Sequence, residues 1–299
     1  MINNINSSAD SFLTDIERLQ ARAERAQRQI SSGLRVSTPS DDPDQVGAIL
    51  QASSDIARNL QILHNLDRVK SEVDGSEQAL STAISTLEKV NVLGAQGANF
   101  DQTAATRRGL ALEVQNQLER LVANANSSVE GRFVFGGDFD QVQPYSIDLT
   151  TPTGTTPYAG AAATRRVEDP RGGTFSTSQT AQQIFDAPGT SVFEAVNALR
   201  VALLANDQAG ITASLGALQT AHDHLSESLS FYGSVQNEVD DGINAGKTLA
   251  LRLAGDLSNL RDADLVDASS ELVSAKLNLD AAFSARARVP RTSLFDFLG

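Results

Sequence analysis

The chain has 299 residues, a formal net charge of −13, few aromatic side chains (5 %) and no cysteine. Its negative charge argues against a nucleic acid or an anionic membrane as a partner, because both require a basic face. The lack of cysteine excludes disulfides, thiolate metal sites and thiol nucleophiles.

A heptad pattern predicts the first helix, from about residue 8 to residue 32. Apolar residues recur there at alternating steps of four and three positions, at Phe12, Ile16, Leu19, Ala23, Ala26 and Ile30. A stripe with this period needs another helix to cover it. Gly33 follows, and glycine readily takes the left-handed conformation that ends a helix.

A polar loop comes next, and its end carries a capping pattern. Asp42 is a good N-cap, Pro43 suits the first helical position, and Gln45 can complete a capping box. The stretch from Asp41 to Asp44 could also hold a calcium ion or an acid–base pair, but it lacks the spacing and the glycine of an EF-hand loop. Helix capping is therefore our interpretation of these acidic residues.

A helical hairpin is expected after Asp44. The three–four alternation continues over residues 66–90, Gly94 and Gly97 interrupt it, and residues 110–125 carry another apolar face. A short connection between the two segments would make them antiparallel.

Residues 131–190 differ in composition from the rest of the chain. They contain five of the eight prolines and are rich in Thr and Gly. Residues 133–135 and 145–149 have the composition of short strands bounded by turn residues. We expect a small β-rich insert here.

The helical pattern returns at residue 191 and continues in a long final stretch from about residue 209 to residue 289, which Pro290 ends. The last part of this stretch carries a second heptad stripe, at Leu265, Ala268, Leu272, Ala275, Leu279 and Ala282. The simplest partner for this stripe is the stripe of the first helix.

The predicted fold is therefore mainly α with a small β-rich insert. We expect an elongated coiled-coil or helical-bundle rod, in which the N- and C-terminal helices pair and the β domain lies at the far tip. Residues 1–40 and 256–299 would form a terminal coiled coil, residues 41–130 and 191–255 a helical rod, and residues 131–190 an outer β domain. Because two helices alone bury little, both ends should order only when neighbouring subunits add contacts.

Catalytic and metal-binding patterns are missing. The sequence has no HExxH, GxGxxG, P-loop or GxSxG motif. His222 and His224 suggest a metal site, but side chains two positions apart on a helix point about 200° away from each other. We expect no catalytic residue, no cofactor and no metal ion, and hence no enzyme.

Both terminal regions resemble the flagellin superfamily. The resemblance rests on residues 27–36 and 41–43 on the N-terminal side, and on residues 263–265 and 272–282 on the C-terminal side. The signature residues are Ser32, Gly33, Leu34, Arg35, Asp41, Asp42 and Pro43. The insert shows no usable similarity.

Two further segments resemble the hook–filament junction proteins of this superfamily. Residues 131–137, followed by Pro144 and Tyr145, are similar to the start of the β domain in junction proteins, and the Phe-Asn-Gly turn expected of a flagellin is missing. Residues 293–298 are similar to the acidic-aromatic tail of junction proteins.

The resemblance implies a structural subunit that joins the hook to the filament and catalyses nothing. It implies that the terminal helices line the inner tube of the axial structure, and that the unfolded chain is exported by the flagellar type III apparatus to the extracellular flagellum. The implied partners are copies of the chain itself, an adjoining hook-junction protein, flagellin and a flagellar export chaperone, without nucleic acid or membrane insertion.

Export without a signal peptide agrees with the start of the chain. Residues 1–8 have neither the basic nor the apolar segment of a cleavable signal, and no apolar run reaches the length of a membrane-spanning helix. Two other functions stay open: a short flagellin, which forms the filament, and a secreted helical adhesin or binding protein whose insert holds a ligand.

We predict an assembly interface on the terminal helices and the tail. Its residues are Phe12, Ile16, Leu19, Ile30, Leu265, Leu272, Leu279, Phe283, Leu294, Phe295, Phe297 and Leu298. Phe295 and Phe297 could pack back onto the first helix, or they could dock onto a neighbouring subunit or an export chaperone. We favour docking, because a core cannot easily form beyond Pro290.

Overall fold

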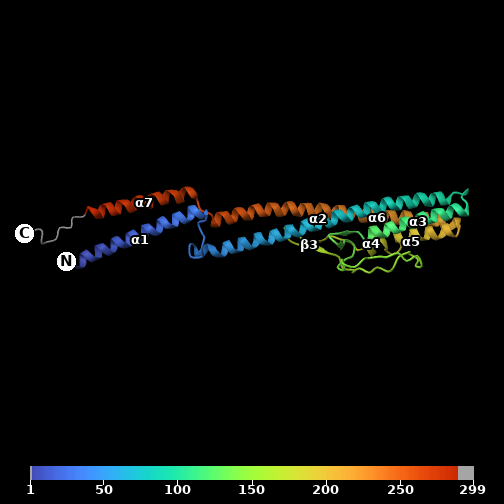
Figure 1. Ribbon diagram of the computed structural model, residues 1–299, viewed down its shortest axis with the longest axis horizontal. Helices are drawn as coiled ribbons and strands as arrows, with labels where there is room; N and C mark the ends of the chain where they lie inside the picture. Colours follow the sequence, from blue (N-terminus) through green and yellow to red (C-terminus); the bar gives the residue numbers. More distant parts are fainter. Residues whose placement is uncertain (1, 289–299) are drawn as a thin grey trace, which may run out of the picture. The chain divides into compact units, whose positions relative to one another are not determined.

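The structure is a computed structural model that describes residues 2–288, with side chains from Asp10 onward. Within this part it has seven helices and two small antiparallel hairpins, which confirms the predicted mainly α fold with a small β insert (Figure 1). The chain divides into two compact units. The terminal unit comprises residues up to Arg58 and from Ala250 onward, and the central unit comprises Asn59–Leu249.

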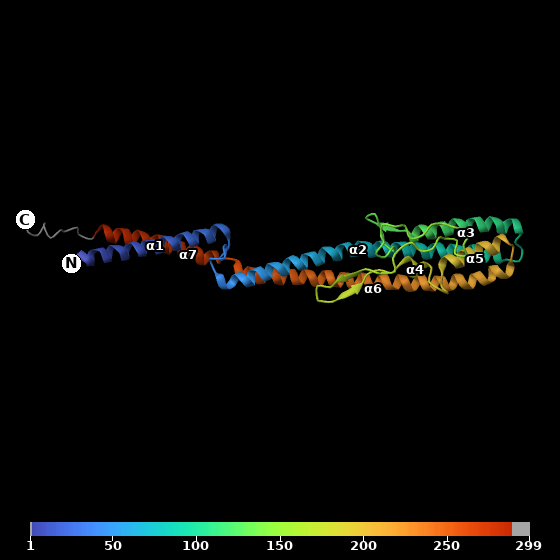
Figure 2. The ribbon, with the colours of Figure 1, turned by 90° about the horizontal axis from the view of Figure 1, so that it is seen from below.

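The terminal unit is built around two antiparallel helices, α1 (Ile2–Ser32) and α7 (Leu265–Ala287). They lie side by side in both views (Figures 1 and 2), so the predicted pairing of the two stripes is confirmed. The ring of Phe12 on α1 meets the ring of Phe283 on α7 edge-on, with 6.5 Å between the ring centres. Aromatic pairs favour this arrangement over a face-to-face stack.

Helix α1 begins at Ile2, earlier than the predicted start at residue 8. The sequence explains the difference, because the apolar stripe continues in the same three–four steps through Ala9 and Ile5. The N-terminal helix is therefore one unbroken amphipathic segment.

Four helices form the bundle of the central unit: α2 (Pro43–Ala98), α3 (Ala104–Ala125), α5 (Val192–Leu204) and α6 (Gln208–Arg261). Within this unit α2 and α6 run antiparallel, and α3 and α5 pack beside them (Figures 1 and 2). Fully buried leucines fill the space between the helices, at Leu66, Leu80, Leu87, Leu118, Leu121 and Leu199. The predicted hairpin is thus the α2–α3 pair.

Helix α2 continues through Gly94 and Gly97, so the prediction that these glycines interrupt it was wrong. A Cβ atom built at Gly97 would lie 2.4 Å from Cδ2 of Leu203, and one at Gly94 would lie 2.8 Å from Cδ2 of Leu215. The missing side chains let α5 and α6 approach α2 closely. Packing therefore outweighs the low helix propensity of glycine here.

The final helical stretch was predicted to be continuous over residues 209–289, but the structure divides it into two helices. Helix α6 ends at Arg261, and Asp264 caps the start of α7. The Asp264 carboxylate accepts hydrogen bonds from the amides of Val266 at 2.8 Å and Asp267 at 3.2 Å. An aspartate that binds backbone amides in this way favours a helix start over a helix interior.

The insert consists of two small hairpins and one short helix. Strand β1 (Ser128–Val129) pairs with β2 (Arg132–Phe133), and β3 (Arg166–Glu168) pairs with β4 (Thr174–Ser176). Helix α4 (Ala181–Phe185) follows and carries a complete capping box. Most of the insert is therefore turn and loop.

The predicted strands 133–135 and 145–149 are only partly present. Strand β2 ends at Phe133, and Ile147 forms an isolated bridge rather than a strand. Val134 and Phe135 are both buried, whereas successive side chains of a strand point to opposite faces. The apolar residues in this region serve packing more than strand pairing.

The insert packs along the side of the central bundle, which corrects the predicted position at the far tip. The Phe135 ring lies 6.1 Å from the ring of Tyr232 on α6, and the Tyr145 ring lies 5.0 Å from the ring of Phe193 on α5. The bundle itself ends at the turn between α2 and α3 and the turn between α5 and α6 (Figure 2).

Candidate assembly site

The first part of the candidate site is the loop that follows α1. Gly33 has a φ of 71°, and its amide donates to the Gln29 carbonyl at 2.8 Å, which closes the helix. The hydroxyl of Ser32 accepts a hydrogen bond from the Leu34 amide at 3.1 Å. The chain therefore leaves α1 in one defined direction, as the glycine predicts.

This loop is joined to the break between α6 and α7. The Gly33 carbonyl accepts a hydrogen bond from the Ala263 amide at 2.9 Å, and the Arg35 amide donates to the Arg261 carbonyl at 2.7 Å. Leu34 forms an antiparallel bridge with Asp262 between these bonds. We call this bridge, residues 33–36 with 260–264, the clamp.

The Arg35 side chain adds two further bonds to the clamp. Its guanidinium donates to the Leu260 carbonyl at 2.6 Å and to the Asp42 carboxylate at 2.8 Å. The positive charge thus lies at the C-terminal end of α6, where a helix favours a cation. The Asp42 carboxylate accepts from Arg35, while Pro43 begins α2 as predicted.

Asp41 holds the rest of the loop in place. Its carboxylate accepts hydrogen bonds from the Thr38 amide at 2.8 Å, the Ser37 hydroxyl at 2.9 Å and the Ser37 amide at 3.0 Å. These bonds, the one from the Thr38 amide first, hold the pKa of Asp41 well below its usual range. Asp41 therefore orders the backbone of the loop, whereas the carboxylate of Asp42, which was predicted to cap α2, binds the Arg35 side chain instead.

The second part of the site is the surface of the α1–α7 pair. Ile16 is buried between the two helices, and Phe12, Leu19, Leu272 and Leu279 are half-buried. Three other positions of the predicted interface stay exposed, namely Ile30, Leu265 and Phe283. The tail positions Leu294, Phe295, Phe297 and Leu298 lie outside the described residues.

Helix α7 has a second apolar face that the sequence analysis missed. Val266, Val273 and Leu277 are 77 %, 66 % and 67 % exposed. At 100° per residue they lie opposite Ala268 and Ala275, which are buried against α1. The spacing of seven and four positions between these residues could have revealed this face. The sequence analysis missed it because it assigned only one apolar stripe to each helix. We call these three residues the outer face of α7.

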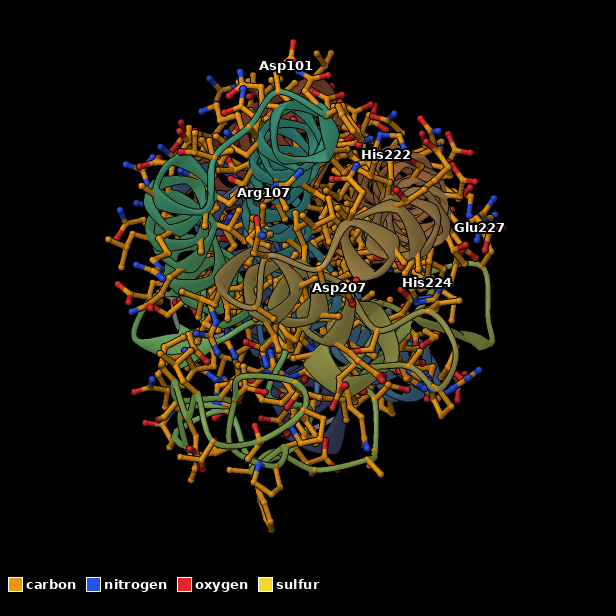
Figure 3. The ribbon with its side chains drawn as sticks, turned by 90° about the vertical axis from the view of Figure 1, so that its right-hand side faces the viewer. Asp101, Arg107, Asp207, His222, His224 and Glu227 are labelled. Atoms are coloured by element: carbon orange, nitrogen blue, oxygen red, sulfur yellow. The ribbon has the colours of Figure 1, made fainter. Side chains whose placement is uncertain are left out.

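The two histidines on α6 face different elements. The His222 imidazole lies 3.9 Å from the Glu88 carboxylate on α2, and the His224 imidazole lies 2.8 Å from the Gln183 carbonyl on α4 (Figure 3). Between residues 2 and 288 no three histidine or acidic side chains gather as a metal site would require. None of the helices in the same range is long and apolar enough to cross a membrane.

Comparisons with known proteins agree with this architecture. Residues 2–140 match the family described as the bacterial flagellin N-terminal helical region. The chain is 25 % identical over 294 residues to flagellar hook-associated protein 3 of Escherichia coli strain K12, covering 89 % of this chain and 90 % of that protein. It is also 25 % identical over 283 residues to flagellin of Bacillus subtilis strain 168, covering 90 % and 89 %.

The fold is similar to that of a putative flagellar hook-associated protein from Vibrio parahaemolyticus, with a TM-score of 0.65 at 22 % identity over 74 % of this chain and 100 % of that chain. The resemblance to the flagellin superfamily is therefore confirmed. In sequence the chain resembles flagellar hook-associated protein 3, and in fold it resembles the putative hook-associated protein.

Proposed function

We propose that this protein is a structural subunit of the bacterial flagellum that joins the hook to the filament. One observation carries the proposal: the terminal helices pair through one apolar stripe and leave further apolar side chains, including the outer face of α7, uncovered. Such a surface indicates a contact with another protein. The similarity to flagellar hook-associated protein 3 indicates that this contact would form in the flagellum, between hook and filament.

The energetics favour assembly through these ends. Burial of one Val or Leu side chain contributes about 1.5–3 kcal/mol, while fixing one residue of backbone costs about 1–2 kcal/mol. A two-helix pair that buries one stripe is therefore marginal alone. Neighbouring subunits that cover the outer face of α7 would supply the missing stabilisation, so ordering and assembly would occur together.

The partners follow from the geometry of a junction. A contact between different surfaces of identical subunits forms either a closed ring or an open helical array, and in a junction a different protein takes the next place on each side. A layer between hook and filament therefore contacts copies of itself, a hook-junction protein on one side and flagellin on the other. Before assembly, export in the unfolded state and a chaperone for the apolar tail would keep these surfaces from aggregating.

A short flagellin is the second candidate. It is favoured by the 25 % identity to the Bacillus subtilis flagellin, over a similar share of both chains. A filament subunit would be the abundant protein of isolated flagella, whereas a junction subunit would be present in few copies.

A deletion strain separates the two functions. If the protein is the junction subunit, cells without it should build hooks and release flagellin into the medium, and a plasmid copy should restore attached filaments. Loss of all filament protein from both cells and medium would indicate a flagellin instead. Normal attached filaments in the deletion strain would contradict both.

A further inference from the structure

The outer face of α7 leads from its apolar residues to an acidic position. Val273 and Leu277 are 66 % and 67 % exposed, and Asp280 is exposed as well. At 100° per residue the three side chains fall within a sector of about 60°, so they share one line along the helix. Leu277 lies about 6 Å and Asp280 about 10 Å from Val273 along the axis. An occupant of this line should present two apolar groups about 6 Å apart and, beyond them, a cation.

The tail of the chain, residues 289–299, carries two apolar groups with this spacing. Phe295 and Phe297 are separated by one residue. In an extended segment, side chains two positions apart point to the same side and lie about 6.6 Å from each other. Such a tail can therefore place one ring over Val273 and the other over Leu277 at the same time.

A tail that runs opposite to α7 also brings opposite charges together. Arg291 and Ser293 lie on the same side of an extended tail as the two rings, because side chains alternate between the two sides. When Phe295 lies over Leu277, these two residues follow in the direction of Asp280. The Ser293 hydroxyl and the long Arg291 side chain can both donate to the Asp280 carboxylate, and a charged pair of this kind forms the stronger hydrogen bonds.

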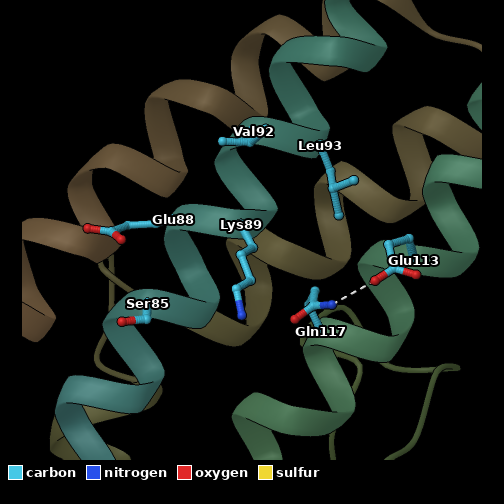
Figure 4. A pocket seen from close by; sticks show the side chains of 7 residues that line it. All are labelled: Ser85, Glu88, Lys89, Val92, Leu93, Glu113 and Gln117. Carbon is cyan, nitrogen blue, oxygen red and sulfur yellow. Dashed lines mark hydrogen bonds between the residues drawn. The ribbon is translucent and has the colours of Figure 1, made fainter.

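The groove between α2 and α3 in the central unit is also apolar, but its charge does not suit the tail. Glu88 and Glu113 line it against the one ammonium group of Lys89 (Figure 4). Asp296 lies between the two phenylalanines of the tail, so the groove would bring a third carboxylate close to two others. Like charges in a contact select against it. On α7 the exposed Lys276 lies on the flank of the outer face, where it favours an acidic tail.

We propose that the tail of one copy docks on the outer face of α7 of a neighbouring copy. Phe297 would cover Val273, Phe295 would cover Leu277, and Arg291 would pair with Asp280. The inference deepens the proposed function, on which it rests for what brings copies together, and it names the segment of the neighbour that covers this face. Each copy gives one tail and receives one, so the contact joins different surfaces and continues from copy to copy.

The tail of the same copy is too short for this contact. Val273 lies about 22 Å back along the helix axis from Arg288, at about 1.5 Å per residue. The residue before a proline favours an extended backbone, so Val289 and Pro290 should lead away from the helix before the chain can turn. The six steps from Arg291 to Phe297 then span only about 20 Å. A neighbouring copy displaced along the axis brings its own outer face within reach.

The absence of cysteine allows a cross-linking test that detects pairs of chains. One full-length chain carries Ser293→Cys in the tail, and a second, tagged chain carries Ser284→Cys, which is exposed on α7. In the proposed contact the two positions lie about 4 Å apart along the axis. The matched control replaces Ser284→Cys by Ser270→Cys, an exposed serine of the same helix that would lie about 18 Å from the tail cysteine.

The purified chains are mixed at high concentration with a short bismaleimide, and the tag separates heterodimers from homodimers on a denaturing gel. We expect severalfold more heterodimer with Ser284→Cys than with Ser270→Cys. Helicity of every variant is measured to exclude unfolding. A deletion strain with normal filaments would remove the proposed function and leave this cross-link in place, so the two can fail separately.

Substitutions in the tail test which side of it makes the contact. Phe295→Asp with Phe297→Asp should lower the heterodimer yield severalfold. Leu294→Asp with Leu298→Asp adds the same charge on the opposite side of an extended tail and should lower the yield much less.

A charge reversal tests the ion pair. Arg291→Glu in the tail chain should reduce the yield severalfold, and Asp280→Arg in the other chain should restore it. Equal heterodimer yields with Ser284→Cys and Ser270→Cys would overturn the docking proposal. A yield that is insensitive to the substitutions at both phenylalanines would overturn it as well.

Discussion

At the scale of single residues, Arg107 joins the two turns that end the central bundle. It is buried, yet its guanidinium donates to the carbonyls of Gly97 at 2.9 Å and Asn99 at 3.2 Å and to the Asn206 side-chain oxygen at 2.7 Å, with a further bond to Gln208 (Figure 3). The charge lies at the C-terminal end of α2, which favours a cation.

Replacing Arg107 by methionine should therefore destabilise the central unit. The substitution leaves the buried Gly97 carbonyl and three partly buried acceptors without this donor, and we expect a loss of about 2–3 kcal/mol in the free energy of unfolding, measured by urea denaturation. The neighbouring Arg108 is exposed, so Arg108→Met should change stability by less than about 0.5 kcal/mol. Equal effects of the two substitutions would contradict the role of Arg107.

The glycines of the bundle offer a second comparison. Gly97→Ala places a methyl group 2.4 Å from the buried Leu203 side chain, and overpacking of this kind costs about 1–3 kcal/mol. Gly216→Ala on α6 meets no atom within 4 Å and should instead stabilise the helix by about 0.5–1 kcal/mol. The midpoint temperatures of thermal unfolding of the two variants should shift in opposite directions. A stabilised Gly97→Ala variant would show that the packing of α5 against α2 does not require a glycine at position 97.

At the scale of elements, a partly buried ionic network holds the insert to α2. Arg165 in the insert donates to the Glu72 carboxylate of α2 at 2.6 Å and to the Asp140 carboxylate at 2.7 Å, and Arg132 also pairs with Asp140. Burial raises the pKa of Asp140, but the hydrogen bonds from Arg132 and Gln141 and the two positive charges outweigh burial and lower it.

This lowered pKa makes the attachment of the insert sensitive to acid. A carboxyl whose pKa is lower in the folded state stabilises the fold above its unfolded pKa, near 3.9, and loses that contribution as the pH falls through the folded value. Asp140→Asn should therefore reduce stability at pH 7 and flatten its decline below about pH 4. The exposed Asp138 of the same loop provides the control, and an Asp138→Asn variant with the same pH profile as Asp140→Asn would refute the network.

The sequence predicts which segments are helical better than it predicts where each helix begins and ends. The stripes of α1 and α7 and the helix-ending Gly33 could be identified because each follows a local rule of period or conformation. The continuity of α2 through Gly97 depends on Leu203, which is distant in the sequence, and the clamp depends on the break before Asp264. Such contacts between remote segments leave no local pattern, so the side position of the insert could not be predicted either.

At the scale of the whole molecule, the proposed assembly depends on apolar surface that one copy cannot cover. The outer face of α7 is the clearest case, because Val266, Val273 and Leu277 point away from α1 and toward solvent. If neighbouring subunits cover this face, a charge placed on it should prevent assembly without affecting the fold of the central unit.

A pair of substitutions tests this directly. Val273→Asp with Leu277→Asp should abolish the complementation of a deletion strain, while the purified variant keeps the unfolding transition of the central unit. Ser274→Asp with Asn278→Asp adds the same charge on the same helix, on a different side, and should retain filament attachment. Normal attachment with the first pair would exclude the outer face of α7 from assembly.

The most direct measurement is amide hydrogen exchange along the two terminal helices, before and after assembly. In the isolated chain we expect the amides of residues 10–32 and 265–287 to exchange far faster than those of α3, in which Val114, Leu118 and Leu121 are buried. In isolated hook–filament junctions the same amides should be as protected as α3. Protection equal to that of α3 already in the isolated chain would contradict the claim that these helices depend on their neighbours.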